Sequence, residues 1–107
     1  MSGAITITVN TFTHGTYKEA ALKPLEEAAE AYASWQGLDA MIDYHDIVES
    51  ENPHMLKYIN LDAERYDLAD ELADCITACA NLAARYALDL QAAIDRVEER
   101  NRERGRY

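Results

Sequence analysis

The sequence predicts an all-α fold, a single helical bundle preceded by a short extended arm. Apolar residues recur at helical spacing after residue 15, and no internal repeat, low-complexity stretch or long linker divides the chain. Its 107 residues are 49% hydrophobic, which is enough to build one core. We therefore expect an arm over residues 1–15 and one domain over 16–107, an antiparallel bundle of four to five helices.

The arm is predicted from a short alternating pattern. Between Ala4 and Phe12, apolar residues alternate with polar ones, which is the period-two pattern of a strand or an extended segment: Ile5, Ile7 and Val9 with Thr6, Thr8 and Asn10. A single strand cannot pair with itself. The segment therefore either lies along the helices or pairs across a subunit interface.

The first helix is expected from about Thr16 or Tyr17 to Trp35, with Gly37 ending it. Pro24 lies inside this span and predicts a kink, and the alternative is a helix that starts just before Pro24. The residues expected to form its stripe are Leu22, Leu25, Ala29, Tyr32 and Gln36.

Three further helices are expected. A shorter one covers 38–50 and is broken at Glu51-Asn52-Pro53. The central helix starts near Pro53 or Leu61 and ends at Tyr86, and the last one runs from an N-cap at Asp89 to about Arg104, with Gly105 stopping it. The expected stripe of the central helix is Leu61, Leu68, Leu72, Cys75, Cys79, Leu82 and Tyr86, and that of the last is Leu90, Ala93, Ile94 and Val97.

The composition limits the classes of molecule that the protein is expected to bind. Twenty acidic and ten basic residues give a net charge of -10, which disfavours nucleic acid but allows a polyanionic small molecule if carboxylates hold a divalent metal. No apolar run is long enough for a membrane span and no signal-peptide pattern opens the chain, so we expect a cytoplasmic protein that binds no membrane. An alanine-rich core is modest, which favours a homodimer or homotetramer.

Two pairs of carboxylates lie on predicted helices. Glu27 and Glu30 are three residues apart, with Glu26 beside them, and Glu71 and Asp74 repeat the same step on the central helix. Like charges on packed helices repel, and Mg²⁺ offsets this because it takes oxygen ligands and bridges carboxylates to phosphates. The pattern predicts a metal-assisted phosphate reaction, although solvated helix faces carry such pairs too.

Other metal or redox chemistry has less support. A di-iron bundle needs Glu-x-x-His steps on helices, and the one match, Glu51 to His54, contains Pro53. The isolated histidines are expected to be surface or structural residues. Cys75 and Cys79 are four apart in a helical segment, a spacing that suits packing better than a disulfide.

The chain also resembles a known family. Two acidic segments are similar to the two signature helices of the MazG-like all-α nucleoside triphosphate pyrophosphatases: residues 23–30 (KPLEEAAE) and residues 70–75 (DELADC). A third segment, residues 101–105 (NRERG), resembles that family's asparagine-containing end. The resemblance covers roughly 17–37 and 61–107. It departs from the family in the long stretch between the two motifs, in Val97 where a lysine is common, and in the arm.

The resemblance implies a fold and an activity. The fold would be of the all-α NTP pyrophosphatase type, and the reaction would convert an NTP or dNTP and water to the monophosphate and pyrophosphate. It implies Mg²⁺, or Mn²⁺ in its place, held by Glu27, Glu30, Glu71 and Asp74. The remaining candidates are Glu26 for the attacking water and, for substrate, Lys23, Asn101 and Arg104. The alternative is a non-enzymatic acidic helical interaction or regulatory protein on the same fold.

Overall fold

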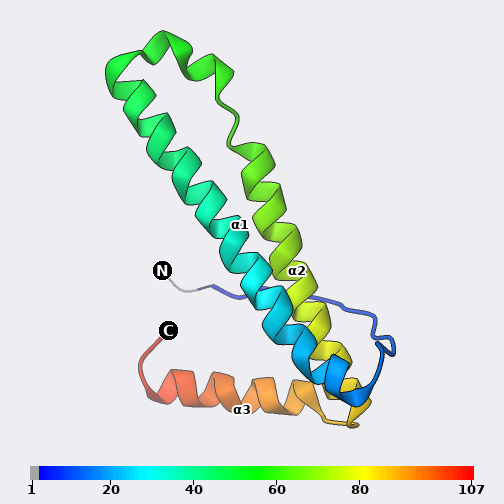
Figure 1. The fold of residues 1–107 in the computed structure, drawn as a ribbon. Helices are drawn as coiled ribbons and strands as arrows, with labels where there is room; N and C mark the ends of the chain where they lie inside the picture. The colour runs from blue at the N-terminus through cyan, green and yellow to red at the C-terminus, as the bar shows by residue number, and fades with distance from the viewer. Residues whose placement is uncertain (1–2) are drawn as a thin grey trace.

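A computed structural model describes residues 3–107, and in this range the chain is helical without any β-strand. Its elements are α1 (Tyr17–Glu51), the short 3-10 helix η1 (Pro53–Tyr58), α2 (Asp62–Arg85) and α3 (Leu90–Glu103), shown in Figure 1. The all-α prediction is therefore confirmed. None of the helices in the described part of the chain is long and apolar enough to cross a membrane.

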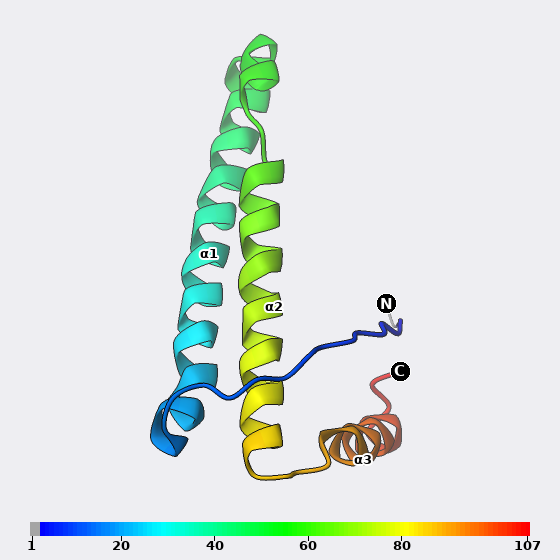
Figure 2. The ribbon, with the colours of Figure 1, turned by 90° about the vertical axis from the view of Figure 1, so that its right-hand side faces the viewer.

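The centre of the molecule is a hairpin of two helices. α1 and α2 run antiparallel and side by side in both views (Figures 1 and 2), and η1 caps the far end of α1. At about 1.5 Å per residue α1 is about 52 Å long, which accounts for the longest dimension of the molecule, 55 Å. Its core consists of small side chains: Ala20, Ala31, Val48, Ala78 and Ala83.

The expected break at Gly37 is wrong. α1 continues through this position, so the separate helix predicted over 38–50 is the second half of α1. A Cβ atom added at Gly37 would lie 3.3 Å from Oε2 of Glu64 on α2. The glycine therefore does not act as a helix stop, and the nearest neighbour of the added Cβ is the end of a flexible side chain.

The expected buried stripe of α1 is wrong as well. Leu25 is 69% and Tyr32 is 59% exposed, whereas Ala20, Glu27 and Ala31 are the residues that face α2. Small residues let the helix axes approach, so packing selected the alanine face over the face with larger side chains.

The helix ends follow their local signals. Thr16 and Glu19 form a capping box at the start of α1, which runs on through Pro24, so the alternative start beside Pro24 is excluded. The side chain of Asp89 accepts the backbone N–H of Ala92 at the start of α3, as predicted. Gly105 follows α3 with φ 71°, the left-handed conformation of a helix stop.

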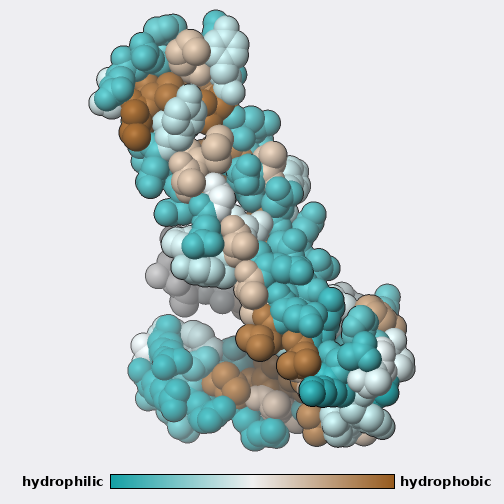
Figure 3. Space-filling view, in the orientation of Figure 1, coloured by the Kyte–Doolittle hydropathy of each residue, from teal (hydrophilic) through white to brown (hydrophobic). Residues whose placement is uncertain are grey.

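α3 does not complete a bundle within one chain. It leaves the base of the hairpin at a steep angle (Figure 1), and its apolar residues Leu90, Ile94 and Val97 remain 39%, 46% and 40% exposed. Figure 3 shows hydrophobic side chains on the base of the hairpin and on the adjoining side of α3, with a hollow between them. The predicted bundle of four to five helices is thus present only as an antiparallel pair plus a projecting helix.

The N-terminal segment is an extended arm without strand pairing in the described residues. It crosses the outside of α2 before turning into α1, as Figure 2 shows. Within the single chain the arm packs across α2, and pairing across a subunit interface stays a prediction.

Candidate metal centre

Three of the predicted carboxylates meet between α1 and α2. Glu27, Glu30 and Glu71 each offer a carboxylate oxygen within 4.8 Å of the others. Glu27 and Glu30 lie one turn apart on α1, and α2 supplies Glu71 from the facing turn, because the hairpin is antiparallel. The fold thus brings together three of the four carboxylates of the two predicted acidic steps.

Two oxygens of this cluster are buried without a partner. Oε2 of Glu27 and Oε2 of Glu71 have no hydrogen bond within the part of the chain that the structure describes. Glu27 as a whole is only 6% exposed. Buried charged oxygens are normally satisfied by donors or cations, so these two atoms are available to a donor or a cation.

Lys23 provides part of the compensating charge. Its Nζ donates to Oε1 of Glu27 at 3.0 Å and lies 3.6 Å from Glu26. This hydrogen bond lowers the pKa of Glu27, against the effect of burial, and Glu27 raises the pKa of Lys23 in turn.

Glu30 shows the opposite effect. Hydrogen bonding to Glu27 and the negative charges of Glu27 and Glu71 raise the pKa of Glu30. A group of carboxylates that resists full ionisation, with a lysine on only one member, has the electrostatics of a cation site.

Asp74 lies one turn beyond Glu71 and lines a cavity of about 180 Å³ together with Glu27 and Lys23. The other walls include Thr77 and Asn81, which belong to the polar stripe of α2. Asp74 therefore faces the carboxylate cluster, although it is not among the three residues whose oxygens lie within 4.8 Å of each other.

Glu26 lies outside the cluster. Its side chain is 58% exposed, and its contact is the ion pair with Lys23. The sequence placed it beside Glu27, but on a helix neighbouring residues point about 100° apart, so it stands at the rim of the site.

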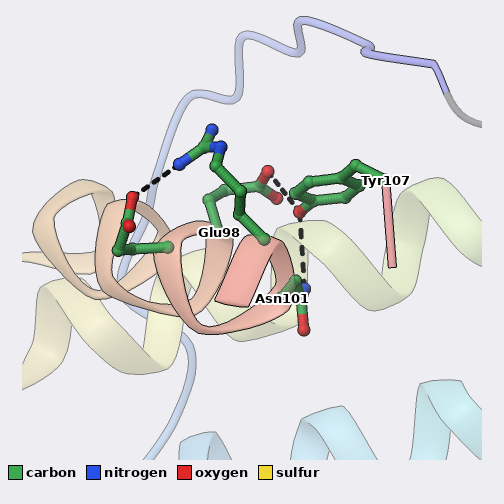
Figure 4. Close-up of polar contacts among 5 residues, drawn as sticks. Glu98, Asn101 and Tyr107 are labelled. Carbon is green, nitrogen blue, oxygen red and sulfur yellow. Dashed lines mark hydrogen bonds and ion pairs between the residues drawn. The ribbon is translucent and has the colours of Figure 1, made fainter. Parts of the chain in front are cut away.

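The predicted substrate residues of α3 are not brought to the carboxylates of their own chain. Asn101 donates from Nδ2 to the Tyr107 hydroxyl at 3.4 Å and accepts from Arg106 at 3.0 Å, and that hydroxyl in turn donates to Glu98 (Figure 4). Arg104 is the exposed C-cap residue of α3. Because α3 projects away from the hairpin, neither side chain can reach Glu27 or Glu71 within one chain.

The arm adds residues that the sequence did not assign. Phe12 and His14 line the same cavity as Glu27 and Asp74. The backbone N–H of Phe12 donates to Oδ1 of the buried Asn81 at 2.8 Å, over a separation of 69 residues. Local spacing carries no signal for such a distant contact, which explains why His14 was expected to be an isolated residue.

Two other groups lie away from this centre. His45, Asp46 and Glu49 gather on the distal half of α1, where the two carboxylates are exposed, and exposed acidic groups of this kind are common on helices. Cys75 and Cys79 are both free thiols on α2, in agreement with the prediction that they form no disulfide.

Comparisons with protein-family models, with curated proteins and with solved structures find no match for this chain.

Proposed function

We propose that the protein is a Mg²⁺-dependent nucleoside triphosphate pyrophosphohydrolase. Water is added across the bond between the α- and β-phosphates, and the products are a nucleoside monophosphate and pyrophosphate. The observation that supports this most is the convergence of Glu27, Glu30 and Glu71 with two buried carboxylate oxygens that lack a partner among residues 3–107. The type of reaction is inferred from the resemblance of the two acidic segments to the MazG-like family.

The residues present fit a hard divalent cation. All the available donors are carboxylate oxygens, which Mg²⁺ prefers and Mn²⁺ also accepts, and no thiol or imidazole belongs to the cluster. Glu27, Glu30 and Glu71, with Asp74 across the cavity, would hold the ion. When bound, the ion neutralises the triphosphate and stabilises the charge that develops during phosphoanhydride cleavage.

The other residues of the site would bind the substrate and orient the reacting groups. The ammonium of Lys23 lies at the cavity wall and would contact a phosphate oxygen while staying close to Glu27. We assign Glu26 the role of holding this ammonium, because it is exposed and lies 3.6 Å from Lys23. Positioning of the attacking water falls to a carboxylate of the cluster, and Glu30, the exposed member, is open to solvent.

We further propose that the working form is an oligomer, with a dimer as the simplest case. A folded monomer of this mass, 12.1 kDa, exposes about 6,000 Å², whereas this chain exposes 8335 Å². The excess is roughly 2,300 Å² per chain, or about 4,600 Å² for two chains, and obligate dimers bury a total area in this range. In such an assembly Asn101 and Arg104 would approach the carboxylates of a second copy, which would give both predicted substrate residues a role.

The direct test is turnover of a panel of ribo- and deoxyribonucleoside triphosphates with Mg²⁺. We expect equimolar monophosphate and pyrophosphate from the native protein, a loss of at least about a hundredfold in Glu71→Gln and Asp74→Asn, and no change in Asp39→Asn. Asp39 is an exposed carboxylate on α1 that lies outside the cluster, so it controls for removal of one negative charge.

Two results would count against the enzyme. Absence of Mg²⁺-dependent turnover on every nucleotide, in a protein whose circular dichroism is helical, would favour the alternative of an acidic interaction or regulatory protein. Turnover that Glu71→Gln and Asp74→Asn leave intact would place the activity elsewhere on the molecule or in a contaminant.

A further inference from the structure

A second cavity lies under the N-terminal arm, next to the carboxylate cavity. It has a volume of about 340 Å³ and is walled by the arm, by the start of α1 and by the end of α2. Both cavities share Phe12, His14 and Asn81 as lining residues, so they are neighbours along the arm. The larger one reaches the lower limit of typical small-molecule sites.

The two cavities differ in charge. The carboxylate cavity contains Glu27 and Asp74, whereas the second one is lined by hydroxyl, amide and basic side chains and by no carboxylate. Thr11 and Thr13 of the arm bring hydroxyl groups, and Arg85 brings a fixed positive charge. The basic residue Arg85 thus lines a cavity without a carboxylate in a chain whose net charge is -10.

The guanidinium of Arg85 and the imidazole of His14 are not taken up by ion pairs. Arg85 stacks over the ring of Tyr17 at 4.3 Å, and within residues 3–107 neither Arg85 nor His14 forms an ion pair with a carboxylate. Ala20, in the first turn of α1, also lines the cavity, which places it near the positive end of that helix's dipole.

The arm is anchored at the place where the cavities meet. The hydrogen bond from Phe12 N–H to Asn81 holds the chain against α2, and Asn81 is itself 93% buried by its neighbours, since only 7% of it is exposed. His14 follows two residues later and faces both cavities. The arm is therefore tied to α2 at Phe12 and forms one wall of both cavities.

We propose that this second cavity is a subsite for the diphosphate part of the substrate, in which Arg85 and His14 bind phosphate oxygens while the α-phosphate lies by the carboxylates. The inference rests on the proposed function for the identity of the anion. A guanidinium and an imidazole next to a carboxylate-held cation would bind the two ends of the triphosphate chain at adjacent places. The diphosphate product would then lie under the arm, beside the start of α1 and the end of α2.

The test uses inorganic pyrophosphate as the probe and isothermal titration calorimetry in EDTA, without divalent metal. We expect the full-length protein to bind pyrophosphate, His14→Gln and Arg85→Gln each to bind it about tenfold more weakly, and Arg85→Lys to recover part of the affinity. Arg65→Gln, which removes an exposed arginine from the other end of α2, should bind like the native protein. His14 lies outside the helices, so its substitution leaves their hydrogen bonding intact.

The outcomes separate this proposal from the proposed function. No binding of pyrophosphate by the native protein, or equal binding by the native protein, His14→Gln and Arg85→Gln, would overturn the subsite even if nucleotide turnover is found. Selective loss of binding in these two variants would establish the anion subsite even if no nucleotide is hydrolysed, because the measurement requires neither metal nor turnover.

Discussion

Glu27 is a carboxylate that the hairpin buries beside a lysine. Its side chain is almost fully covered, yet hydrogen bonding to Lys23 lowers its pKa, so the ionised form persists in the folded protein. Removing only one partner of such a pair leaves an uncompensated charge in a place that water reaches poorly. The stability of the fold is therefore coupled to the charge of this residue.

Lys23→Met should destabilise the protein in a pH-dependent way. Because the pKa of Glu27 is lowered in the folded state, the ion pair adds stability above the unfolded pKa of a glutamate and loses it as the pH falls through the lower, folded value. We expect the melting temperature of Lys23→Met to be a few degrees below that of the native protein at pH 7 and the gap to close on acidification. A gap that stays constant with pH would contradict the coupling to Glu27.

Glu30→Gln should stabilise the metal-free protein, whereas Lys23→Met destabilises it. The pKa of Glu30 is raised by Glu27 and Glu71, so its ionised form opposes folding at neutral pH, and this penalty disappears as the pH falls through the raised value. We expect the variant to melt higher than the native protein at pH 7 without metal and the difference to shrink as the pH falls through the raised pKa of Glu30 towards the ordinary value of a glutamate.

Mg²⁺ should then reverse this order. A cation that binds only the folded native protein raises its stability by about 2.7 kcal/mol when its concentration is 100 times the dissociation constant. Glu30→Gln, with one proposed ligand missing, should gain much less. Melting curves with and without Mg²⁺ measure both effects, and equal gains by the two proteins would remove Glu30 from the proposed ligand set.

At the scale of the helices, the starts of α1 and α3 were predicted because local chemistry decides them, whereas the length of α1 was not. The capping box of Thr16 and Glu19 and the cap at Asp89 act within four residues, and the predicted boundaries at 16–17 and 89 are confirmed. The face that each helix buries was not predictable for α1, because the choice between alanines and larger apolar residues depends on the neighbouring helix.

Gly37→Ala tests the interpretation of the unbroken α1. Alanine is favoured over glycine in a helix interior by about 1 kcal/mol. The new Cβ would lie 3.3 Å from the end of the flexible Glu64 side chain, which can move aside at little cost. We expect urea unfolding to show a gain of roughly 0.5–1 kcal/mol. A loss would mean that the close approach of α1 and α2 at this position tolerates no side chain.

The candidate site could be predicted only in part for a related reason. Spacing along each helix placed Glu27 with Glu30 and Glu71 with Asp74, and antiparallel packing was enough to bring the pairs together. The contribution of the arm was not predictable, since Phe12 and Asn81 are 69 residues apart and no periodicity connects them. The same limit applies to Asn101, whose place in the proposed site depends on a second chain.

At the scale of the whole molecule, one chain is more open than a compact domain of the same length. Its radius of gyration is 18.3 Å, whereas a compact domain of this length has about 13 Å. No large side chain is fully buried in the described residues. Most of the apolar surface that could form a core is thus exposed, and α3 presents its apolar face to the hollow beside the hairpin.

Ile94→Asp should separate the proposed dimer. The substitution places a charge at the centre of the exposed apolar stripe of α3, and burying an unpaired carboxylate in an interface is strongly unfavourable. Light scattering after size exclusion should give twice the chain mass for the native protein and for Arg96→Gln, which changes the net charge equally, but about one chain mass for Ile94→Asp.

If Asn101 acts on a second copy, Ile94→Asp must also lose nucleotide turnover. Mixing it with an excess of Glu71→Gln should not restore activity, because the charged face still excludes the partner. A native protein that is monomeric at tens of micromolar yet fully active would show that the hairpin and arm of one chain suffice for the reaction.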